Sequence, residues 1–352
     1  MKALVYGGPG QRSWTDVPDP SLKDPEDAVV RVEAVTICGS DLHILKGDLP
    51  EVQPGRVLGH EAVGTVLEVG SAVRDIKVGQ RVLVSCISSC GQCRYCREGR
   101  YGQCLGGGGW ILGHTIDGTQ AEMVRVPFAD RSLHVLPDDV TNEAALLLAD
   151  ILPTAYEVGV LAGKVSPGDV VLIVGAGPVG LAALTTARLF SPSRIVVVDP
   201  EPTRREEALR LGADAAVAPD ADVRAELGYW TEGLGADVAI EAVGIASTFE
   251  MCADLVRPGG RIANVGVHGA PVTLHLERLW TRDVTITTGL VDTSTTSLLL
   301  RLMSDGKLDA SPLITHRFCL DEMETAYDVF ADPATSHALK VALTRDEQMP
   351  FA

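Results

Sequence analysis

Four cysteines follow one another at short intervals in a polar, glycine-rich segment, as Cys90-x2-Cys93-x2-Cys96-x7-Cys104. Four thiolates at this spacing can enclose one tetrahedral Zn²⁺ and leave no coordination position open, so the ion would fold a loop rather than bind substrate. An iron–sulfur cluster uses similar spacings, but it would need a route for electron transfer. Free buried cysteines fit so polar a loop poorly. We therefore predict a structural zinc in a lobe over residues 86–110.

A second set of candidate ligands is scattered over the first 150 residues: Cys38, His60, Glu61 and Asp150. Together they offer one thiolate, one imidazole and two carboxylates, the mixture of donors that forms an open catalytic zinc site. Taken singly, each has an ordinary explanation, such as a buried cysteine or a core histidine. Their spacing alone does not bring them together, so their convergence is a hypothesis.

A glycine-rich loop, Gly175-Ala176-Gly177-Pro178-Val179-Gly180, follows an apolar strand and opens an apolar helix. In this setting Gly175 allows a tight turn, Gly177 lets a pyrophosphate approach the backbone, and Gly180 lets the helix pack closely on the strand. The phosphates would rest on the N–H groups at the helix N-terminus. The alternative is a plain turn between strand and helix, but both flanks favour a dinucleotide site.

The cofactor preference depends on Asp199, which closes the second strand nineteen residues after Gly180. A carboxylate there accepts hydrogen bonds from ribose hydroxyls and repels a 2′-phosphate, which favours NAD over NADP. The alternative role for Asp199, which directly precedes Pro200, is to cap the helix that follows. Arg204 and Arg205 can reach a 2′-phosphate, so NADP stays the second choice.

The elements that must position these residues change character along the chain. Short β-rich runs between glycine turns predict a β-barrel-like unit in the first 150 residues; the runs are Lys2–Tyr6, Ala28–Thr36, Ala62–Val69, Arg81–Ser85 and Ala121–Val126. After Pro153, apolar strands alternate with helical segments, as in VVLIVG, PVGLAALTTARLF and RIVVVD, with further strands at ADVAIEAVG, GRIANVG and VTITTG. This alternation predicts a parallel sheet covered on both faces. Helices over Thr296–Ser304 and around Leu320–Phe330 and a strand over residues 337–345 follow, so the class is α/β with a β-rich domain.

Composition excludes several classes of partner. The 352 residues carry a formal net charge of −17, which argues against binding to nucleic acid or to an anionic membrane surface. The first residues, MKALVYGGPG, do not resemble a signal peptide, and no apolar run approaches the roughly 20 residues that span a bilayer. We expect a cytoplasmic protein whose eight cysteines are thiols or metal ligands.

Nearly the whole chain resembles the zinc-containing medium-chain alcohol dehydrogenases. The matching segments are ICGSDLH (37–43), GHEAVGTVLEVG (59–70), VGQRVLV (78–84), the four-cysteine segment (90–104) and the GAGPVG loop (175–180). The resemblance implies a GroES-like catalytic domain, residues 1–153 and 295–352, and an inserted Rossmann domain, residues 154–294. It also implies that Cys38, His60 and Asp150 ligate the catalytic zinc, with Glu61 as a neighbouring or exchangeable ligand.

One feature of the resemblance concerns the third zinc ligand. Many relatives carry a second cysteine where this chain has Asp150, and the aspartate version resembles bacterial secondary-alcohol dehydrogenases. Trp110 falls where that branch places an aromatic wall of the substrate pocket. Members of that branch often lack the four-cysteine lobe and use NADP, so this chain departs from them on both counts.

The resemblance also implies a mechanism. Zinc lowers the pKa of a bound alcohol, and the hydride passes to the nicotinamide. The proton leaves through the Ser40 hydroxyl, a ribose hydroxyl and His43, although Ser40 and His43 could instead cap the helix that starts there. Residues expected near the nicotinamide are Thr154, Val243, Val265 and Val267; those expected to line the pocket, if they are not plain core, are Ile87, Trp110 and Leu290. No partner is predicted for His114, His134, His268, His275, His316 or His337.

We therefore expect an NAD-dependent zinc alcohol dehydrogenase that acts on a primary or secondary alcohol, or on the matching aldehyde or ketone, with two zinc ions per chain. A polyol, threonine or other substituted-alcohol dehydrogenase is the main alternative, and a non-catalytic nucleotide-binding redox sensor is a remote one. The filled ligand positions exclude a zinc-free quinone reductase. The family forms dimers and tetramers, and we favour a homotetramer over a homodimer.

Overall fold

The computed structural model describes residues 1–345 and divides the chain into two units. The first unit combines Met1–Asp150 with the chain from Asp292 onward, and the second is the continuous segment Ile151–Val291. Each junction therefore lies three residues before the one expected from the sequence (1–153 and 154–294).

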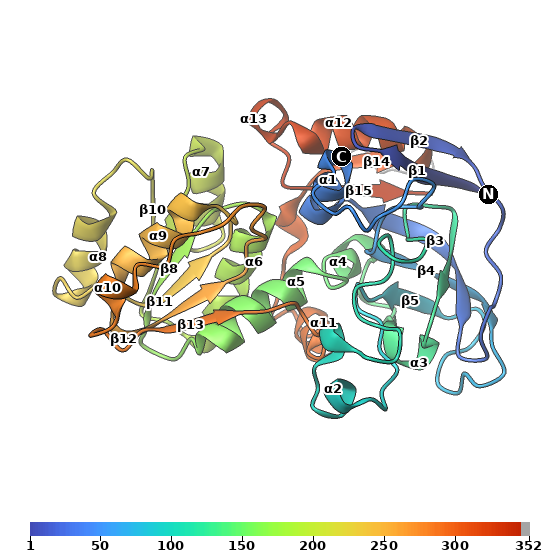
Figure 1. The fold of residues 1–352 in the computed structure, drawn as a ribbon, viewed down its shortest axis with the longest axis horizontal. Coiled ribbons are helices and arrows are strands. Elements are labelled where there is room, and N and C mark those ends of the chain that lie inside the picture. Colours follow the sequence, from blue (N-terminus) through green and yellow to red (C-terminus); the bar gives the residue numbers. More distant parts are fainter. Residues whose placement is uncertain (346–352) are drawn as a thin grey trace. The chain divides into compact units, whose positions relative to one another are not determined.

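The first unit is built on a seven-stranded mixed sheet. Its order is β14-β15-β3-β4-β5-β7, and β6 also pairs with β3; only β14 and β15 run parallel (Figure 1). The bounds are β3 Ala28–Thr36, β4 Ala62–Val69, β5 Arg81–Val84, β6 Met123–Val126, β7 Leu133–Val135, β14 Ile314–Cys319 and β15 Lys340–Thr344. A separate hairpin is formed by β1 Lys2–Gly8 and β2 Gln11–Asp16. Strands from both parts of the chain thus share one sheet.

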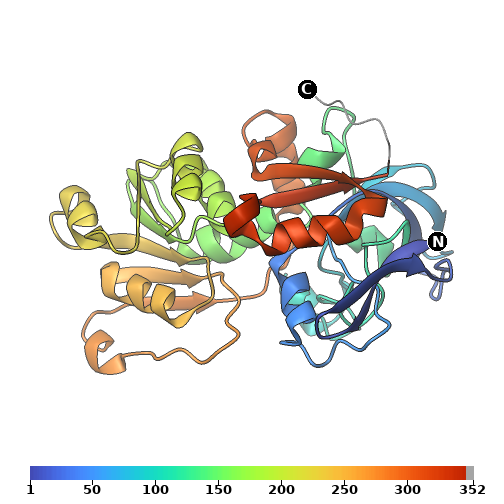
Figure 2. The same cartoon turned by 90° about the horizontal axis from the view of Figure 1, so that it is seen from above.

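Short helices connect these strands. They are α1 Gly39–Lys46, α2 Arg94–Arg97, α3 Ala129–Ser132, α4 Asn142–Leu146, α11 Thr296–Ser304, α12 Met323–Ala331 and α13 Pro333–Ser336, with 3-10 turns at Tyr101–Gln103, Ser311–Leu313 and Leu320–Glu322. Helix α12 packs on β15 and on the hairpin strand β2 (Figure 2). Its apolar face buries Met323, Ala326 and Tyr327 in the core of this unit, and burial of such side chains is the main stabilising term in folding.

The second unit is a six-stranded sheet in which every neighbouring pair is parallel, in the order β10-β9-β8-β11-β12-β13. Its strands are β8 Val170–Val174, β9 Arg194–Val198, β10 Ala215–Val217, β11 Ala236–Glu241, β12 Val256–Asn264 and β13 Thr285–Thr288. Its helices are α5 Ile151–Thr154, a π-helix Ala155–Leu161, α6 Pro178–Ala187, a 3-10 turn Arg188–Phe190, α7 Pro202–Arg210, α8 Val223–Thr231, α9 Ala246–Leu255 and α10 Leu276–Leu279. The strand order reverses between β8 and β11, and doubly wound sheets bind ligands at the carboxyl ends of strands at such a point.

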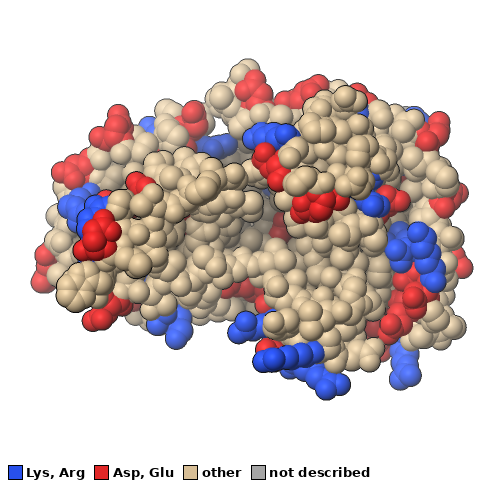
Figure 3. All heavy atoms as spheres, viewed as in Figure 1, with Lys and Arg blue, Asp and Glu red and all other residues tan. Residues whose placement is uncertain are grey.

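No helix among residues 1–345 is long and apolar enough to cross a membrane. On the face drawn in Figure 3, acidic and basic side chains are interspersed rather than gathered into a single field.

His134, on the edge strand β7, gives the first unit a pH-dependent stability. Burial lowers the pKa of this histidine from 6.5 to about 4. Between these values the unfolded chain binds the proton and the folded chain does not, so the contribution is complete above pH 6.5 and is lost as the pH falls to 4. Because the ring is only partly shielded from water, we expect about 2 kcal/mol of this pH dependence, less than the full shift implies. Denaturant titrations at pH 7 and pH 4.5 should show a smaller loss for His134→Asn than for the wild type, and equal losses would contradict this assignment.

Candidate active site

The scattered ligands predicted from the sequence converge in the first unit. One donor atom from each of Cys38, His60, Glu61 and Asp150 lies within 4.8 Å of the other three. The Asp150 Oδ2 atom is 3.4 Å from the Cys38 sulfur and 3.5 Å from His60 Nε2. The Glu61 Oε1 atom lies 4.0 Å from the same imidazole nitrogen. A thiol, an imidazole and two carboxylates therefore point toward one position.

Helix α1 fixes the orientation of two of these groups. Cys38 immediately precedes the helix, and Asp41 in its first turn accepts a 2.9 Å hydrogen bond from the Cys38 N–H. The other Asp41 oxygen lies 3.7 Å from His60 Nδ1, longer than a hydrogen bond, and faces the ring nitrogen opposite the cluster. A carboxylate behind the second nitrogen is the usual support of a metal-bound histidine. The sequence analysis did not identify Asp41.

A buried lysine completes the charges around Glu61. Lys340 on β15 donates a 2.6 Å hydrogen bond to Glu61 Oε1 and a 3.0 Å bond to the Ile37 carbonyl, and both charged side chains are 1% exposed. The sequence analysis missed Lys340, although a lysine between apolar neighbours in the strand LKVAL was a possible signal. An ion pair this deep is retained only when well-placed hydrogen bonds offset its desolvation.

The protonation chemistry of the cluster fits a bound cation. Burial, reinforced by the charge of Asp150, raises the pKa of the Cys38 thiol. Burial opposes the charged form of His60, yet hydrogen bonds to Asp150 and Cys38 hold its pKa well above the usual range. Glu61 Oε2 has no hydrogen-bond partner among residues 1–345. A divalent ion would offset these buried negative charges, and the sulfur, nitrogen and oxygen donors suit zinc.

Cys86 is a further residue that the sequence analysis did not assign to the site. It follows β5, is 3% exposed, and its sulfur lies 3.7 Å from Asp150 Oδ1. Asp150 therefore contacts sulfur on both sides, with Cys38 at one oxygen and Cys86 at the other. Cys86 can restrict how the Asp150 carboxylate turns.

Ser40 and His43 both lie on α1, the helix that begins after Cys38. Asp41 provides the capping hydrogen bond at its start, and neither of the two predicted relay side chains caps the helix. The His43 ring bonds Asp48 through Nδ1 at 2.7 Å.

The predicted pocket residues have different surroundings. Ile87 is buried in the first unit, and Leu290 is 44% exposed in the second. The Trp110 indole meets the His60 ring edge-on, with ring centroids 5.7 Å apart and a 74° interplanar angle. Trp110 therefore lies beside the cluster.

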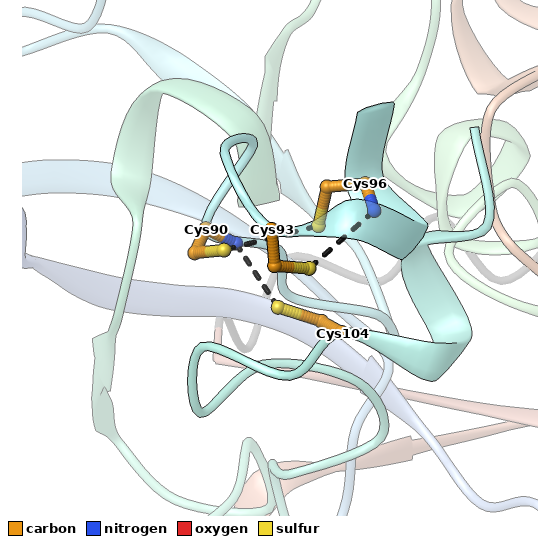
Figure 4. Close-up of side chains that lie close together, drawn as sticks. All are labelled: Cys90, Cys93, Cys96 and Cys104. Carbon is orange, nitrogen blue, oxygen red and sulfur yellow. Dashed lines mark hydrogen bonds between the residues drawn. The ribbon is translucent and has the colours of Figure 1, made fainter. Parts of the chain in front are cut away.

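The four cysteines of the lobe also come together. One sulfur from each of Cys90, Cys93, Cys96 and Cys104 lies within 4.8 Å of the others (Figure 4). None of the eight cysteines, all within residues 1–345, forms a disulfide. A side chain at Gly106 would place its Cβ 2.6 Å from the Cys90 sulfur, so only glycine leaves room for this turn.

Backbone amides surround these sulfurs. The Cys93 sulfur accepts hydrogen bonds from the N–H groups of Cys96 and Leu105, which lower the pKa of Cys93 to about 6. Burial, and then the neighbouring Cys93 sulfur, raises the pKa of Cys96 to about 12. The four groups cannot all be thiolates without a cation among them, and four sulfur donors leave no open position on zinc.

The dinucleotide loop has the predicted backbone geometry. Strand β8 ends at Val174, Gly175 takes a φ of +101°, and α6 begins at Pro178. A Cβ on Gly180 would lie 1.8 Å from the Gly175 carbonyl oxygen, so the helix can approach the strand only with glycine there.

Asp199 stands beside this loop. One carboxylate oxygen accepts a 2.7 Å bond from the Ala176 N–H and the other a 2.9 Å bond from the Glu201 N–H. Arg204 Nη1 lies 4.0 Å away, whereas Arg205 donates to the carbonyls of Asp199 and Pro200. Asp199 thus connects the loop to the end of β9. Of the residues expected near the nicotinamide, Thr154 ends α5, and Val243, Val265 and Val267 follow β11 and β12.

Two histidines for which the sequence predicted no partner lie in defined networks. His268 Nε2 is 2.8 Å from Asn264 Oδ1 and 3.4 Å from the buried carboxylate of Glu241 at the end of β11. The His114 ring stacks on Trp110. Asn264 and Trp110 each lie four residues before their histidine, whereas Glu241 lies 27 residues before His268 and has no local sequence signal.

A closed thiolate lobe, a buried thiol–imidazole–carboxylate cluster and a doubly wound sheet with a dinucleotide loop define a zinc-binding dehydrogenase. Residues 24–138 match the alcohol dehydrogenase GroES-like domain, and residues 178–305 match the zinc-binding dehydrogenase domain. The chain belongs to the zinc-containing medium-chain alcohol dehydrogenase family and is an oxidoreductase.

Individual relatives match this chain over nearly its full length. An alcohol dehydrogenase from Cupriavidus necator is 37% identical over 97% of this chain and 98% of its own length. The structure of zinc-dependent alcohol dehydrogenase 2 from Streptococcus pneumonia, in its apo form, has a TM-score of 0.94 and 47% identity, covering 99% of both chains. A zinc-binding dehydrogenase from Sinorhizobium meliloti, solved with NADP, has a TM-score of 0.85 and 30% identity, covering 97% of this chain and 98% of its own.

Proposed function

We propose that this protein transfers a hydride between a primary or secondary alcohol, or the matching aldehyde or ketone, and NAD(H). The observation that carries the proposal is the convergence of Cys38, His60 and Asp150 in a chain that also holds a dinucleotide loop. Zinc held by these three residues would supply a Lewis acid that lowers the pKa of the alcohol hydroxyl, and NAD would supply the hydride acceptor.

The protein groups have separate tasks in this proposal. Asp41, whose carboxylate lies 3.7 Å from His60 Nδ1, would orient the ring so that Nε2 faces the metal. Lys340 holds Glu61 beside the cluster through a 2.6 Å bond, where its carboxylate is a neighbouring or exchangeable ligand. The second cluster, Cys90, Cys93, Cys96 and Cys104, would hold a zinc ion that stabilises the lobe.

Asp199 and the glycine loop support NAD as the cofactor. The carboxylate is 3% exposed and is held by two backbone N–H groups, so a 2′-phosphate would meet a fixed negative charge. Arg204 alone could offset that charge, at 4.0 Å. NADP therefore remains the second choice.

Metal analysis of the purified protein, combined with a panel of substrates, tests the proposal. We expect two zinc ions per chain and oxidation of simple alcohols that is faster with NAD than with NADP. Polyols and threonine belong in the panel, because a clear preference for them would replace simple alcohols as the substrate class. A chain that binds NAD but oxidises none of these compounds would refute the proposal. Homotetramer assembly and a cytoplasmic location stay predictions.

The proton path is the part of the mechanism assigned to α1. Ser40 would take the alcohol proton at its hydroxyl, and His43 would pass a proton to solvent. Ser40→Ala should lower turnover about a hundredfold and leave both zinc ions in place, because general acid–base groups contribute on this scale. Ser40→Thr, which keeps the hydroxyl, is the matched control. Near-normal turnover of the alanine variant in steady-state assays would exclude Ser40 from the path.

A further inference from the structure

Three side chains, Trp110, His114 and Glu51, contact one another in turn next to His60 in the first unit. The Trp110 indole meets His60 edge-on. The His114 ring is stacked on the indole, with ring centroids 4.5 Å apart and an interplanar angle of 8°. The carboxylate of Glu51 lies 3.1 Å from His114 Nε2. The row runs from Glu51, which is half-exposed, to His60, which is 4% exposed.

Two oxygen atoms hold the ring of His114 in place. Its Nδ1 lies 3.1 Å from the carbonyl oxygen of Trp110, and its Nε2 lies 3.1 Å from Glu51 Oε1. A carbonyl oxygen and a carboxylate oxygen therefore face the two ring nitrogens. The Glu51 backbone amide and then His114 lower the pKa of Glu51, which keeps it a carboxylate. These two contacts fix the plane of the His114 ring beside the indole.

Two aromatic rings stacked at this centroid distance attract each other beyond the effect of the area that they bury. The indole N–H of Trp110 is buried and has no hydrogen-bond partner among residues 1–345. Its own polar group therefore does not fix the ring. Trp110 packs against the apolar core of the first unit, and its ring is also stacked on His114, which Glu51 contacts from the surface.

We propose that His114 and Glu51 are positioning residues that fix the Trp110 indole beside His60 and thereby limit the size of the substituents accepted on the alcohol carbon. The selectivity part rests on the proposed function. Loosening the stack would let the indole rotate, so kcat/KM for bulky alcohols would rise relative to kcat/KM for small ones.

The first test is spectroscopic and needs no activity. A histidine ring in contact quenches indole emission, and subtracting the spectrum of a Trp110→Phe variant isolates Trp110 from the other tryptophans. We expect its emission to rise in His114→Gln and to rise less in Glu51→Gln, which keeps an acceptor. Glu68→Gln, at an exposed position of β4, is the control and should change nothing.

The second test compares kcat/KM for 2-propanol and 1-phenylethanol. In His114→Gln the preference for 2-propanol should fall about tenfold, mainly through KM, with the zinc content unchanged. If His114 had a merely structural role, kcat/KM would fall by the same factor for both alcohols and their ratio would stay unchanged. Unchanged Trp110 emission or an unchanged ratio would overturn the proposal. A wild-type enzyme inactive on all alcohols would overturn the proposed function and the selectivity part together, while the emission still decides whether His114 holds Trp110.

Discussion

Replacing Asp150 by alanine is expected to remove one of two zinc ions and to lower alcohol oxidation by at least about a thousandfold, because a Lewis acid contributes several kcal/mol to such a reaction. The carboxylate lies 3.4 Å from the Cys38 sulfur and 3.5 Å from His60 Nε2, so its loss removes one of the three proposed ligands. Zinc content and turnover are the two measurements.

Asp150→Cys is the matched control for this experiment. A thiolate is a good zinc ligand, so this variant should keep both ions and a large part of the activity. Asp150→Ala with two zinc ions and near-normal turnover would show that Asp150 is not a ligand. Loss of both ions in the alanine variant would indicate unfolding, which circular dichroism would detect.

The second large effect concerns the lobe. Cys96→Ser should remove the other zinc ion and cost at least about 3 kcal/mol of stability, because the energy of binding a structural metal is folding energy. On a protein of this size that loss corresponds to a melting temperature about 4 °C lower. Differential scanning calorimetry and limited proteolysis within residues 86–110 would measure it.

Cys319→Ser is the control for the lobe. At that position, before the turn Leu320–Glu322, a serine hydroxyl can accept the same backbone hydrogen bond as the sulfur. This variant should keep two zinc ions and the wild-type melting temperature. If the Cys96→Ser protein retained both ions and had the wild-type melting temperature, the lobe would not have the predicted structural role.

Local patterns predicted the parts of the fold that have strong local signals. The continuous apolar runs of β8 and β9 and the glycine loop between β8 and α6 were all found from the sequence. Strand β2, which is largely exposed, and the three-residue strand β10 have too little hydrophobic pattern and were missed.

The candidate site also contains some residues with a strong local signal in the sequence and others without one. The four lobe cysteines lie within fifteen residues, so their spacing alone indicated a metal. Cys38, His60 and Asp150 required a family resemblance to be grouped. Asp41, Cys86 and Lys340 act through contacts that only the folded chain creates, since Lys340 and Glu61 are 279 residues apart in sequence.

The position of β15 has a consequence for how the protein is made. The ligand candidates all lie in the first 150 residues, but the lysine that neutralises Glu61 is on a strand inserted between β14 and β3, about 300 residues after β3. At ribosomal speed the interval is on the order of 15 to 60 seconds. During synthesis the second unit, which is continuous in sequence, can fold first. Until Lys340 is made, the Glu61 carboxylate lacks the charge that neutralises it, and the sheet of the first unit lacks β15.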